Sequence, residues 1–468
     1  MFNQLKEDLR EHSYFNDKRL SHRFGTIIES IGETYGSSLP RAGGNHGQTQ
    51  ALYRFMNNEK VTSQALYQSD ASRLKEQVSG LSGRTFISVS DKTELDYSTA
   101  KSRHVLDCLD DVKRHGLYTQ SQMLMDNAGC PWGLIRQTHF NRPASEVGNA
   151  RKMSSKERDS KPIEEKESYH WLKDLAALHT LFGQMPQHRF IHIIDAEGDI
   201  FELFAARRFD HIHFLTRVKH DRSLVDNELK LKAAVAQSPC QGCRILRVKD
   251  DKTGKKRLAR LEIRYISLTI DVSQNLQKYQ KDKNYSPLKV QVVEAKEIID
   301  KTEPHDFDPL HWLLITSLPI DDLEQALDII HYYTLRWRIE DFHVVLKQGA
   351  HIEQLQFETQ EALKNAIVVY SIVAITVLRI RYLSKSQPQL PIQEAGFEVQ
   401  DVQILVTYLT KVRKIKIAMP NQPTIADFAQ CLALLATGNK NNTGIRALWT
   451  GFREFKLIKD TFSLINST

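Results

Sequence analysis

The sequence predicts an α/β fold with helical regions on either side of a sheet-bearing core, and three observations support this. Between residue 1 and about residue 70, apolar residues recur at the spacing of an amphipathic helix. From Thr85 onward, β-branched runs typical of strands alternate with helical patterns, as in α/β cores. After about residue 365 the pattern is again helical. We therefore predict three parts: helical residues 1–70, a core over residues 71–365 and helical residues 366–468.

Length and composition exclude several classes of protein. The chain has 468 residues, 41% of them hydrophobic, and a formal net charge of +7, which permits a polyanionic partner. Five scattered cysteines argue against a disulfide scaffold and fit a reducing compartment, so we expect a cytoplasmic protein. The longest apolar run, Ala366–Leu378, falls short of the roughly 20 residues of a membrane span and predicts a buried helix. We expect no membrane partner.

The first 70 residues are predicted to form a small helical module. Apolar residues from Leu20 to Ile31 mark one helix, residues 40–45 (PRAGGN) mark a loop, and residues 47–58 mark a second helix. Basic residues lie between the apolar positions and are expected to face outward: Arg19, Arg23 and Arg54.

The core is predicted to contain short strands and one β-rich insertion. The run TFISVSD ends at Asp91, and a buried strand over residues 190–194 ends at a turn at Asp195. Alternating runs over about residues 221–307 form the predicted insertion. Further predicted elements are a surface loop over residues 142–166, strands over residues 213–220 and 311–319, and a long helix over about residues 322–347.

Asp91 and Asp195 are the first candidate functional residues. An aspartate at the end of a strand is often a turn residue or a helix N-cap, and that interpretation stays open for each. If the two strands are neighbours, both carboxylates point into the crevice where α/β sheets bind ligands. Paired carboxylates suit Mg²⁺ or Mn²⁺ better than zinc, because every ligand atom is an oxygen.

The third candidate is Glu340, within the predicted long helix. At about 100° per residue, Tyr333, Arg336, Glu340 and Lys347 share one narrow face of that helix. A solvated face with an Arg336–Glu340 ion pair is one interpretation. The other is a metal-binding glutamate between cations that hold phosphate oxygens. The pattern alone does not separate the two.

These segments resemble a known family. The spacing Y-x2-R-x3-E-x6-K from Tyr333 to Lys347 is similar to the signature of the IS-four family of bacterial DDE transposases. ISVSDKT around Asp91, IIDAEGDI around Asp195 and RWRIEDFHVVLKQGA around Glu340 resemble that family's three acidic boxes. WLLITSLP, QALYRFMNN and ALWTGFREF also match in order, so the resemblance covers nearly the whole chain.

The resemblance implies a ribonuclease-H-like core in which Asp91, Asp195 and Glu340 are catalytic and bind two Mg²⁺ or Mn²⁺ ions. It implies hydrolysis at the transposon end, a hairpin intermediate and joining of the 3′-OH to target DNA. Tyr333, Arg336 and Lys347 match residues that hold the DNA backbone near the cut.

The same resemblance implies further DNA contacts and a partner subunit. Trp312 matches an aromatic residue that stacks at the hairpin end, where a base is flipped out. The N-terminal module is implied to bind the terminal inverted repeats, and the C-terminal region to form a homodimer that cleaves double-stranded DNA in trans. Aromatic and leucine residues of that region are candidates for a docking face: Trp449, Phe452, Phe455, Leu457 and Phe462.

A basic cluster after the strand at residues 213–220 is another candidate for DNA contact, with a solvated charge run as the alternative. It consists of Arg217, Lys219, His220 and Arg222.

Two weaker features and two alternative functions remain open. Lys92 places a cation beside the first acid, where a small hydroxyl residue is more usual in the family, and Cys240 and Cys243 form a single C-x2-C that is typical of a turn. The alternatives are a metal-dependent nuclease without strand transfer and a catalytically silent, transposase-derived DNA-binding protein.

Overall fold

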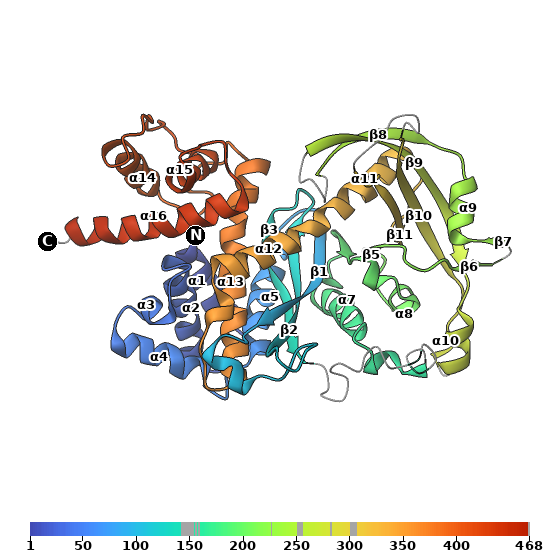
Figure 1. Ribbon diagram of the computed structural model, residues 1–468, viewed down its shortest axis with the longest axis horizontal. Coiled ribbons are helices and arrows are strands. Elements are labelled where there is room, and N and C mark those ends of the chain that lie inside the picture. Colours follow the sequence, from blue (N-terminus) through green and yellow to red (C-terminus); the bar gives the residue numbers. More distant parts are fainter. Residues whose placement is uncertain are drawn as a thin grey trace. The chain divides into compact units, whose positions relative to one another are not determined.

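The chain folds into a mixed α/β protein with two compact units, as a computed structural model shows (Figure 1). The first unit comprises residues 1–82, 91–151 and 338–468, and the second comprises residues 83–90 and 152–337. The structure describes residues 1–141, 154, 157, 160–225, 227–249, 256–280, 283–299 and 307–466.

The first unit is mainly helical and also contains an antiparallel strand pair, β2 (Gly116–Asp126) and β3 (Pro131–Phe140). Its helices are α1 (Phe2–Glu11), α2 (Lys18–Glu33), α3 (Leu39–Gly43), α4 (His46–Met56), α5 (Ser63–Ser79), α12 (Arg338–Val344), α13 (Gln360–Ser386), α14 (Val399–Lys411), α15 (Ile425–Thr437) and α16 (Ile445–Asn466).

Helix α13 forms the core of the first unit. It packs against α2, α4, α5, α15, α16 and β3. By length and composition α13 is apolar enough to cross a membrane, but 83% of its most apolar window is buried inside the protein, as expected of the predicted core helix. The Asn365 side chain of α13 donates hydrogen bonds to the carbonyl oxygens of Met56 and Val61 at 2.9 and 2.7 Å. These bonds tie the N-terminal helices to α13.

A buried ion pair joins α5 to β3. The Arg73 guanidinium lies 2.6 Å from the Asp70 carboxylate, with 5% and 0% of the two side chains exposed. Arg73 also donates to the Trp132 carbonyl at 3.0 Å, and the second carboxylate oxygen of Asp70 accepts the Leu134 amide at 2.7 Å. The pair is therefore saturated with hydrogen bonds, which offset the desolvation of its charges.

The second unit is built on a mixed sheet. The first residues of β1 (Thr85–Asp96) pair in parallel with β4 (Arg189–Ile193), which pairs in parallel with β5 (Ile212–Arg217). The sheet continues through antiparallel neighbours β11 (His311–Thr316), β10 (Leu288–Glu297) and β9 (Lys256–Ile270). The smaller elements are β6 (Ser223–Leu224), β7 (Asn227–Lys230), β8 (Gly242–Lys249), α7 (Tyr169–Phe182), α8 (Phe201–Ala205), α9 (Leu231–Gln237), α10 (Gln274–Tyr279) and α11 (Leu323–Thr334).

Several sequence predictions differ from the structure. The predicted loop at residues 40–45 contains the short helix α3, because a proline in the first turn needs no N–H partner; Gly44, at a φ of +74°, ends it. Phe452 and Phe455 are fully buried among other aromatic rings, so they belong to the core and not to a docking face. Residues 142–153, within the predicted surface loop, lie outside the described residues.

The boundaries predicted at about residues 70 and 365 do not coincide with those of the two compact units. Residue 70 lies within α5, and residues 365 and 366 are consecutive in the continuous helix α13. Residues 221–307 contain strands β6 to β10, with α9 and α10 between them, and the exposed free thiols Cys240 and Cys243 lie at the start of β8.

We expect Asp70→Ala to lower the free energy of unfolding by about 3–5 kcal/mol, because Arg73 would be left as an uncompensated buried charge. Urea unfolding followed by circular dichroism measures this. Glu361→Ala is the control: its ion pair with Lys364 spans 2.9 Å, but the glutamate side chain is 72% exposed. That loss is expected to be at most about 1 kcal/mol. Equal losses in both variants would contradict a structural role for the buried pair.

Candidate active site

Asp91, Glu340 and His343 form the central cluster of the first unit. One carboxylate oxygen from each acid and one ring nitrogen of His343 all lie within 4.8 Å of one another. The two acids are half-buried and the histidine is buried. Two carboxylates and an imidazole nitrogen are a donor set that fits a divalent cation.

The carboxyl end of β1 is held in place by the segment that follows residue 349. The Asp96 amide donates to the Glu353 carboxylate at 2.9 Å, and the Tyr97 hydroxyl donates to the Ile352 carbonyl at 3.0 Å. Further along, the Ser102 hydroxyl donates to the Leu355 carbonyl at 3.0 Å. These bonds fix the strand that carries Asp91 relative to the chain just beyond Glu340.

Glu340 lies on α12, which is attached to the core helix α13. The neighbouring residue, Asp341, accepts a hydrogen bond from the Tyr382 hydroxyl and lies 3.3 Å from the Arg381 guanidinium. Both partners are on α13. The position of Glu340 therefore depends on α13 as well as on its own helix.

The helix predicted over about residues 322–347 is present as a continuous helical run, but it is not a regular α-helix. Helix α11 ends at Thr334, a 3₁₀ turn spans Leu335–Trp337, and a π-helical segment spans Val345–Gly349 after α12. The Val345 carbonyl accepts both the Ala350 amide, five residues on, and the Tyr35 hydroxyl, at 3.0 and 2.8 Å. The wider turn follows from this bonding. A regular 100° step does not apply across residues 334–349.

Lys347 lies within the π-helical segment. Its ammonium is 4.0 Å from the Glu353 carboxylate, and 29% of its side chain is exposed. It therefore reaches solvent, with an acidic neighbour that also accepts the Asp96 amide.

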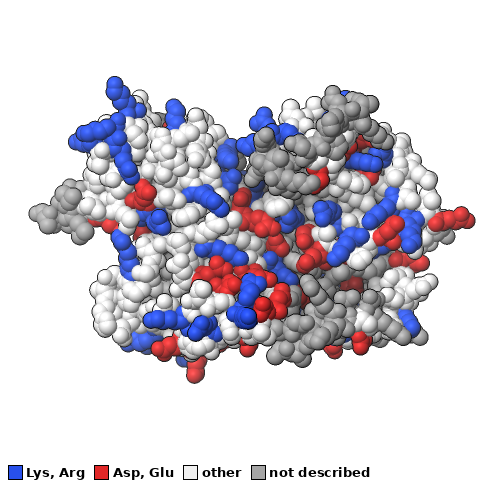
Figure 2. All heavy atoms as spheres, in the orientation of Figure 1, with Lys and Arg blue, Asp and Glu red and all other residues white. Residues whose placement is uncertain are grey.

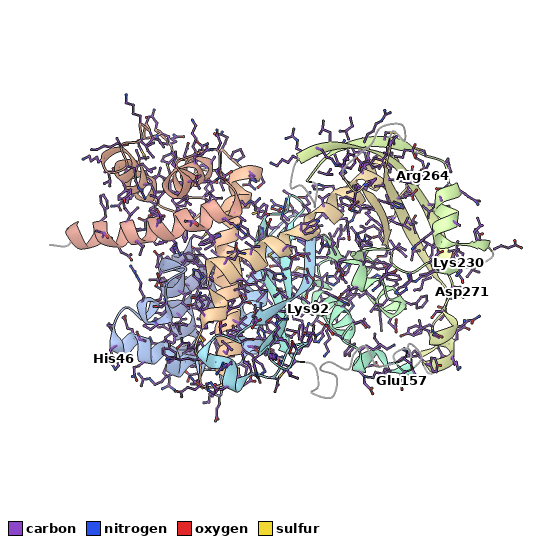
Figure 3. All side chains as sticks on the ribbon, in the orientation of Figure 1. His46, Lys92, Glu157, Lys230, Arg264 and Asp271 are labelled. Carbon is purple, nitrogen blue, oxygen red and sulfur yellow. The ribbon has the colours of Figure 1, made fainter. Side chains whose placement is uncertain are left out.

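Asp195 belongs to the second unit, directly after β4. One carboxylate oxygen accepts the Glu197 amide at 2.7 Å and caps a short 3₁₀ helix, so the helix-cap interpretation holds for that oxygen. The Thr216 hydroxyl donates to the Asp195 carbonyl. In the same way, one oxygen of Asp91 accepts the Lys92 amide at 2.8 Å. The Lys92 ammonium itself lies 5.5 Å from the centre of the Tyr118 ring (Figure 3).

The strand predicted to end at Asp91 continues to Asp96, so Asp91 lies within β1. Its first residues, up to Val89, pair in parallel with β4, where Val89 is opposite Ile193. Asp195 follows β4 by two residues, as predicted for an acid at the end of a strand.

Tyr333 is surrounded by charged residues of the second unit. It is 5% exposed, and burial raises the pKa of its hydroxyl, while the charges of Arg336 and Arg217 lower that pKa and Asp195 raises it. The ring of Trp312 packs edge-on against Tyr333, with centroids 5.6 Å apart. Of the sequence-predicted residues, the second unit therefore brings Asp195, Arg217, Trp312, Tyr333 and Arg336 together.

The basic cluster after β5 is only partly available to a ligand. Arg222 donates to the carboxylate of Asp199 at 2.5 Å, with 11% and 0% of the two side chains exposed, so its guanidinium is engaged by a buried acid. Asp199 also accepts the backbone amides of Lys219 and His220 at 2.7 Å each. Their side chains are exposed, as is that of Arg217. Arg222, which the sequence shows only as part of a basic run, is thus the ion-pair partner of buried Asp199.

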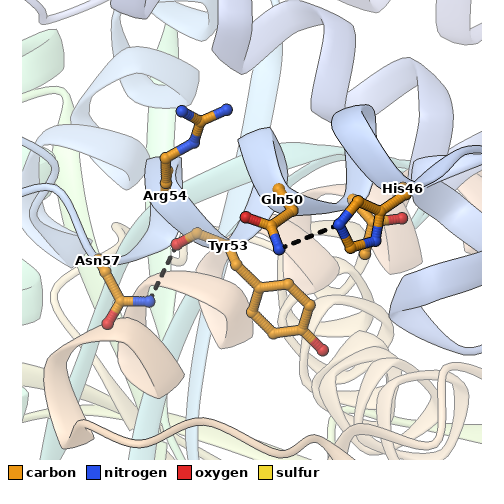
Figure 4. A pocket seen from close by; sticks show the side chains of 6 residues that line it. His46, Gln50, Tyr53, Arg54 and Asn57 are labelled. Carbon is orange, nitrogen blue, oxygen red and sulfur yellow. Dashed lines mark hydrogen bonds between the residues drawn. The ribbon is translucent and has the colours of Figure 1, made fainter.

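The N-terminal arginines are exposed. Arg19 pairs with Asp17 at 2.9 Å while 91% of its side chain stays in solvent, and Arg23 lies exposed on the same helix, α2. Arg54 lies on α4 beside a shallow pocket (Figure 4). The pocket is lined by His46, Thr49, Gln50, Tyr53, Arg54 and Asn57.

Three features of the structure were not predicted from the sequence. His343 follows Glu340 at the i, i+3 spacing that places two side chains on one helix face, and this spacing was the available signal. Trp337 is 52% exposed, with the Arg336 guanidinium 4.7 Å from its ring centre. Basic side chains gather around the connection between α14 and α15 (Figure 2), where the exposed residues include Lys411, Arg413, Lys414 and Lys416.

Two segments of the chain match known families. Residues 4–61 match the family described as Transposase DNA-binding, and residues 173–376 match the family described as Transposase DDE domain. The second match includes Asp195 and Glu340, whereas Asp91 precedes it. The matched segment therefore does not include Asp91, and the proximity of Asp91 to Glu340 is an observation of the structure.

The chain is also similar to a solved structure, the cryo-EM structure of a piggyBac transposase synaptic complex with hairpin DNA. The two share 8% identity with a TM-score of 0.30, and the match covers 65% of this chain and 49% of that chain. This chain thus spans about half of that one. At this TM-score the likeness carries no argument.

The buried imidazole of His343 predicts a pH dependence of stability. Burial, and then the charge of Lys347, lower its pKa from 6.5 to about 3. The folded chain therefore keeps this ring neutral while the unfolded chain protonates it below pH 6.5, so the ring favours unfolding as the pH falls toward 3. We expect His343→Gln to make the fall in unfolding free energy shallower by up to about 1.4 kcal/mol per pH unit. Urea unfolding at pH 6, 5 and 4.5 tests this, and parallel curves would contradict it.

Proposed function

We propose that this chain, which carries the DNA-binding and DDE domains of a DDE transposase, is a cut-and-paste DNA transposase. It binds the terminal inverted repeats of its element, cleaves DNA there by metal-dependent phosphoryl transfer and joins the 3′-OH ends to target DNA. The observation that carries the proposal is the convergence of Asp91 and Glu340, from distant parts of the sequence, on one potential metal site.

The proposed active site contains Asp91, Asp195 and Glu340. Support for Asp195 comes from the resemblance of the segment IIDAEGDI to the second acidic box of the IS-four family, and from its place within the matched DDE domain. In line with that resemblance, we propose a ribonuclease-H-like fold for the catalytic domain. One oxygen of Asp91 and one of Asp195 accept backbone amides, and these bonds orient the two carboxylates.

The acids would hold two Mg²⁺ or Mn²⁺ ions. The chemistry that such ions supply is activation of the attacking oxygen and stabilisation of the leaving oxygen in an in-line displacement. The chain's own contribution is to orient the carboxylates: β1, which carries Asp91, is bonded to Glu353, and α12, which carries Glu340, is bonded to α13.

Cations and aromatic residues are proposed to position the DNA: Arg336, Trp312 and Tyr333 of the second unit and Lys347 of the first. Arg336 offers a planar guanidinium for a phosphate, and Lys347 offers a point charge. Trp312, packed on Tyr333, provides an aromatic face on which an unstacked base can lie. Such a base would belong to a hairpin intermediate, which we propose in line with the resemblance to the IS-four family and to the transposase of transposon five.

Helix α4 is proposed to read the terminal repeat. His46, Gln50 and Arg54 follow one another at four-residue spacing and are exposed, so they lie along one side of the helix. Glutamine and arginine are side chains that read adenine and guanine in the major groove. Arg19 and Arg23 on α2 would hold phosphates, and cleavage in trans by a homodimer completes the proposal.

We expect Asp195→Asn to lower cleavage of DNA flanking the gene by at least about 10³-fold, as for loss of one member of a catalytic unit. The assay incubates purified protein with this DNA and Mg²⁺ and resolves cleaved and joined products on a denaturing gel. Asp210→Asn, at an exposed acid between α8 and β5, is the control and should retain activity. Cleavage without joined products would instead indicate a nuclease, and binding without cleavage in Mg²⁺ or Mn²⁺ a silent DNA-binding protein.

We expect Arg54→Ala to weaken binding to the terminal repeat by about 1–3 kcal/mol if the guanidinium reads a base edge. Affinity is measured by fluorescence anisotropy at several salt concentrations, with random DNA for comparison. Arg244→Ala, at an exposed position on β8, is the matched control. Unchanged affinity in the Arg54 variant would remove α4 from the proposed interface.

A further inference from the structure

His343 is the member of the acidic cluster to which the proposed function assigns no role. Its side chain is 6% exposed, and among the described residues its Nε2 has no hydrogen-bond partner. One of its ring nitrogens lies within 4.8 Å of a carboxylate oxygen of both Asp91 and Glu340. A buried polar atom without a partner is costly, and such atoms in folded proteins call for an explanation such as an ion.

An orphaned nitrogen is not by itself a ligand. Half-buried His139 and buried His192 also have a buried Nε2 without a partner among the described residues, and their other nitrogens bond to the hydroxyls of Thr119 and Ser88. His343 differs because it is grouped with two carboxylates in a set that could hold a metal ion. The combination of burial, an unmade hydrogen bond and two nearby acids singles it out.

The spacing of the cluster suits direct ligation of one ion. Ligand atoms bound to an ion at about 2.1 Å lie at most about 4.2 Å apart. Atoms that are already within 4.8 Å reach such an arrangement by side-chain movements of a few tenths of an ångström. The i, i+3 spacing of Glu340 and His343 on α12 places both side chains on one face of that helix.

We propose that His343 is a direct metal ligand, so that one of the two metal positions is a mixed site of Asp91, Glu340 and an imidazole nitrogen. This inference rests on the proposed function and extends it beyond the three acids. It predicts a metal preference: imidazole is a ligand for transition metals, whereas Mg²⁺ favours oxygen ligands and water. The mixed position should therefore prefer Mn²⁺ to Mg²⁺ more strongly than three carboxylates alone would.

The test uses the full chain loaded with Mn²⁺ alone. Electron spin-echo envelope modulation detects the magnetic coupling of a directly bound ¹⁴N nucleus to Mn²⁺. We expect this coupling in the native chain and its loss in His343→Gln, which substitutes an amide oxygen for the nitrogen. Titration of the same samples should show Mn²⁺ affinity lowered by about 10-fold or more, with a smaller change for Mg²⁺.

His139→Gln is the matched control, because half-buried His139 lies in the same unit and also has a buried Nε2 that is unpartnered among the described residues. It should keep the nitrogen coupling, and circular dichroism of both variants checks that they are folded. Failure of the native chain to bind Mn²⁺, or binding without nitrogen coupling, would overturn the inference. Normal DNA cleavage in that second case would leave the proposed function standing, whereas loss of cleavage with intact coupling would count against the function alone.

Discussion

Burial of helix α13 is the constraint on which the first unit depends. Its apolar side chains are covered on all sides by α2, α4, α5, β3, α15 and α16, and each buried aliphatic side chain contributes about 1.5–3 kcal/mol. Polar groups then fix the orientation of the neighbours. Asn365 holds the chain after α4, the Ser371 hydroxyl accepts from Gln137 of β3 at 2.9 Å, and Tyr382 and Arg381 hold Asp341.

The same helix therefore supports two functions that are far apart in the sequence. The residues matched to a transposase DNA-binding family, 4–61, contain α4, and the DDE match contains Glu340. Both segments are attached to α13 by hydrogen bonds from buried or half-buried side chains. The proposed DNA-binding surface and the proposed catalytic glutamate therefore share one supporting helix.

Exposed and buried charged side chains differ in their hydrogen-bond partners. Exposed cations such as Arg23 and Arg54 remain available to phosphates, which suits binding that depends on counterion release. Buried charges are instead saturated, as in the Asp70–Arg73 pair and in Asp199, which accepts from Arg222 and two backbone amides. Among the described residues, the Asp91–Glu340–His343 cluster groups two carboxylates with a buried histidine whose Nε2 has no partner. This combination makes the cluster suited to a cation.

The sequence by itself determined the main elements that carry the candidate residues, because side-chain periodicity follows local backbone geometry. The β-branched and apolar runs predicted β1 and β4, the strands of Asp91 and Asp195, and the longest apolar run predicted α13. The sequence also marked Asp91, Asp195 and Glu340 as candidates. Only the tertiary structure decided that the helical run ends in a π-helical segment, where the carbonyl of Val345 also accepts the hydroxyl of distant Tyr35. The tertiary structure likewise pairs Arg222 with Asp199, buries Phe452 in the core, and places His343 beside Asp91 and Glu340. Each of these outcomes depends on partners brought together by folding, and no local pattern records them.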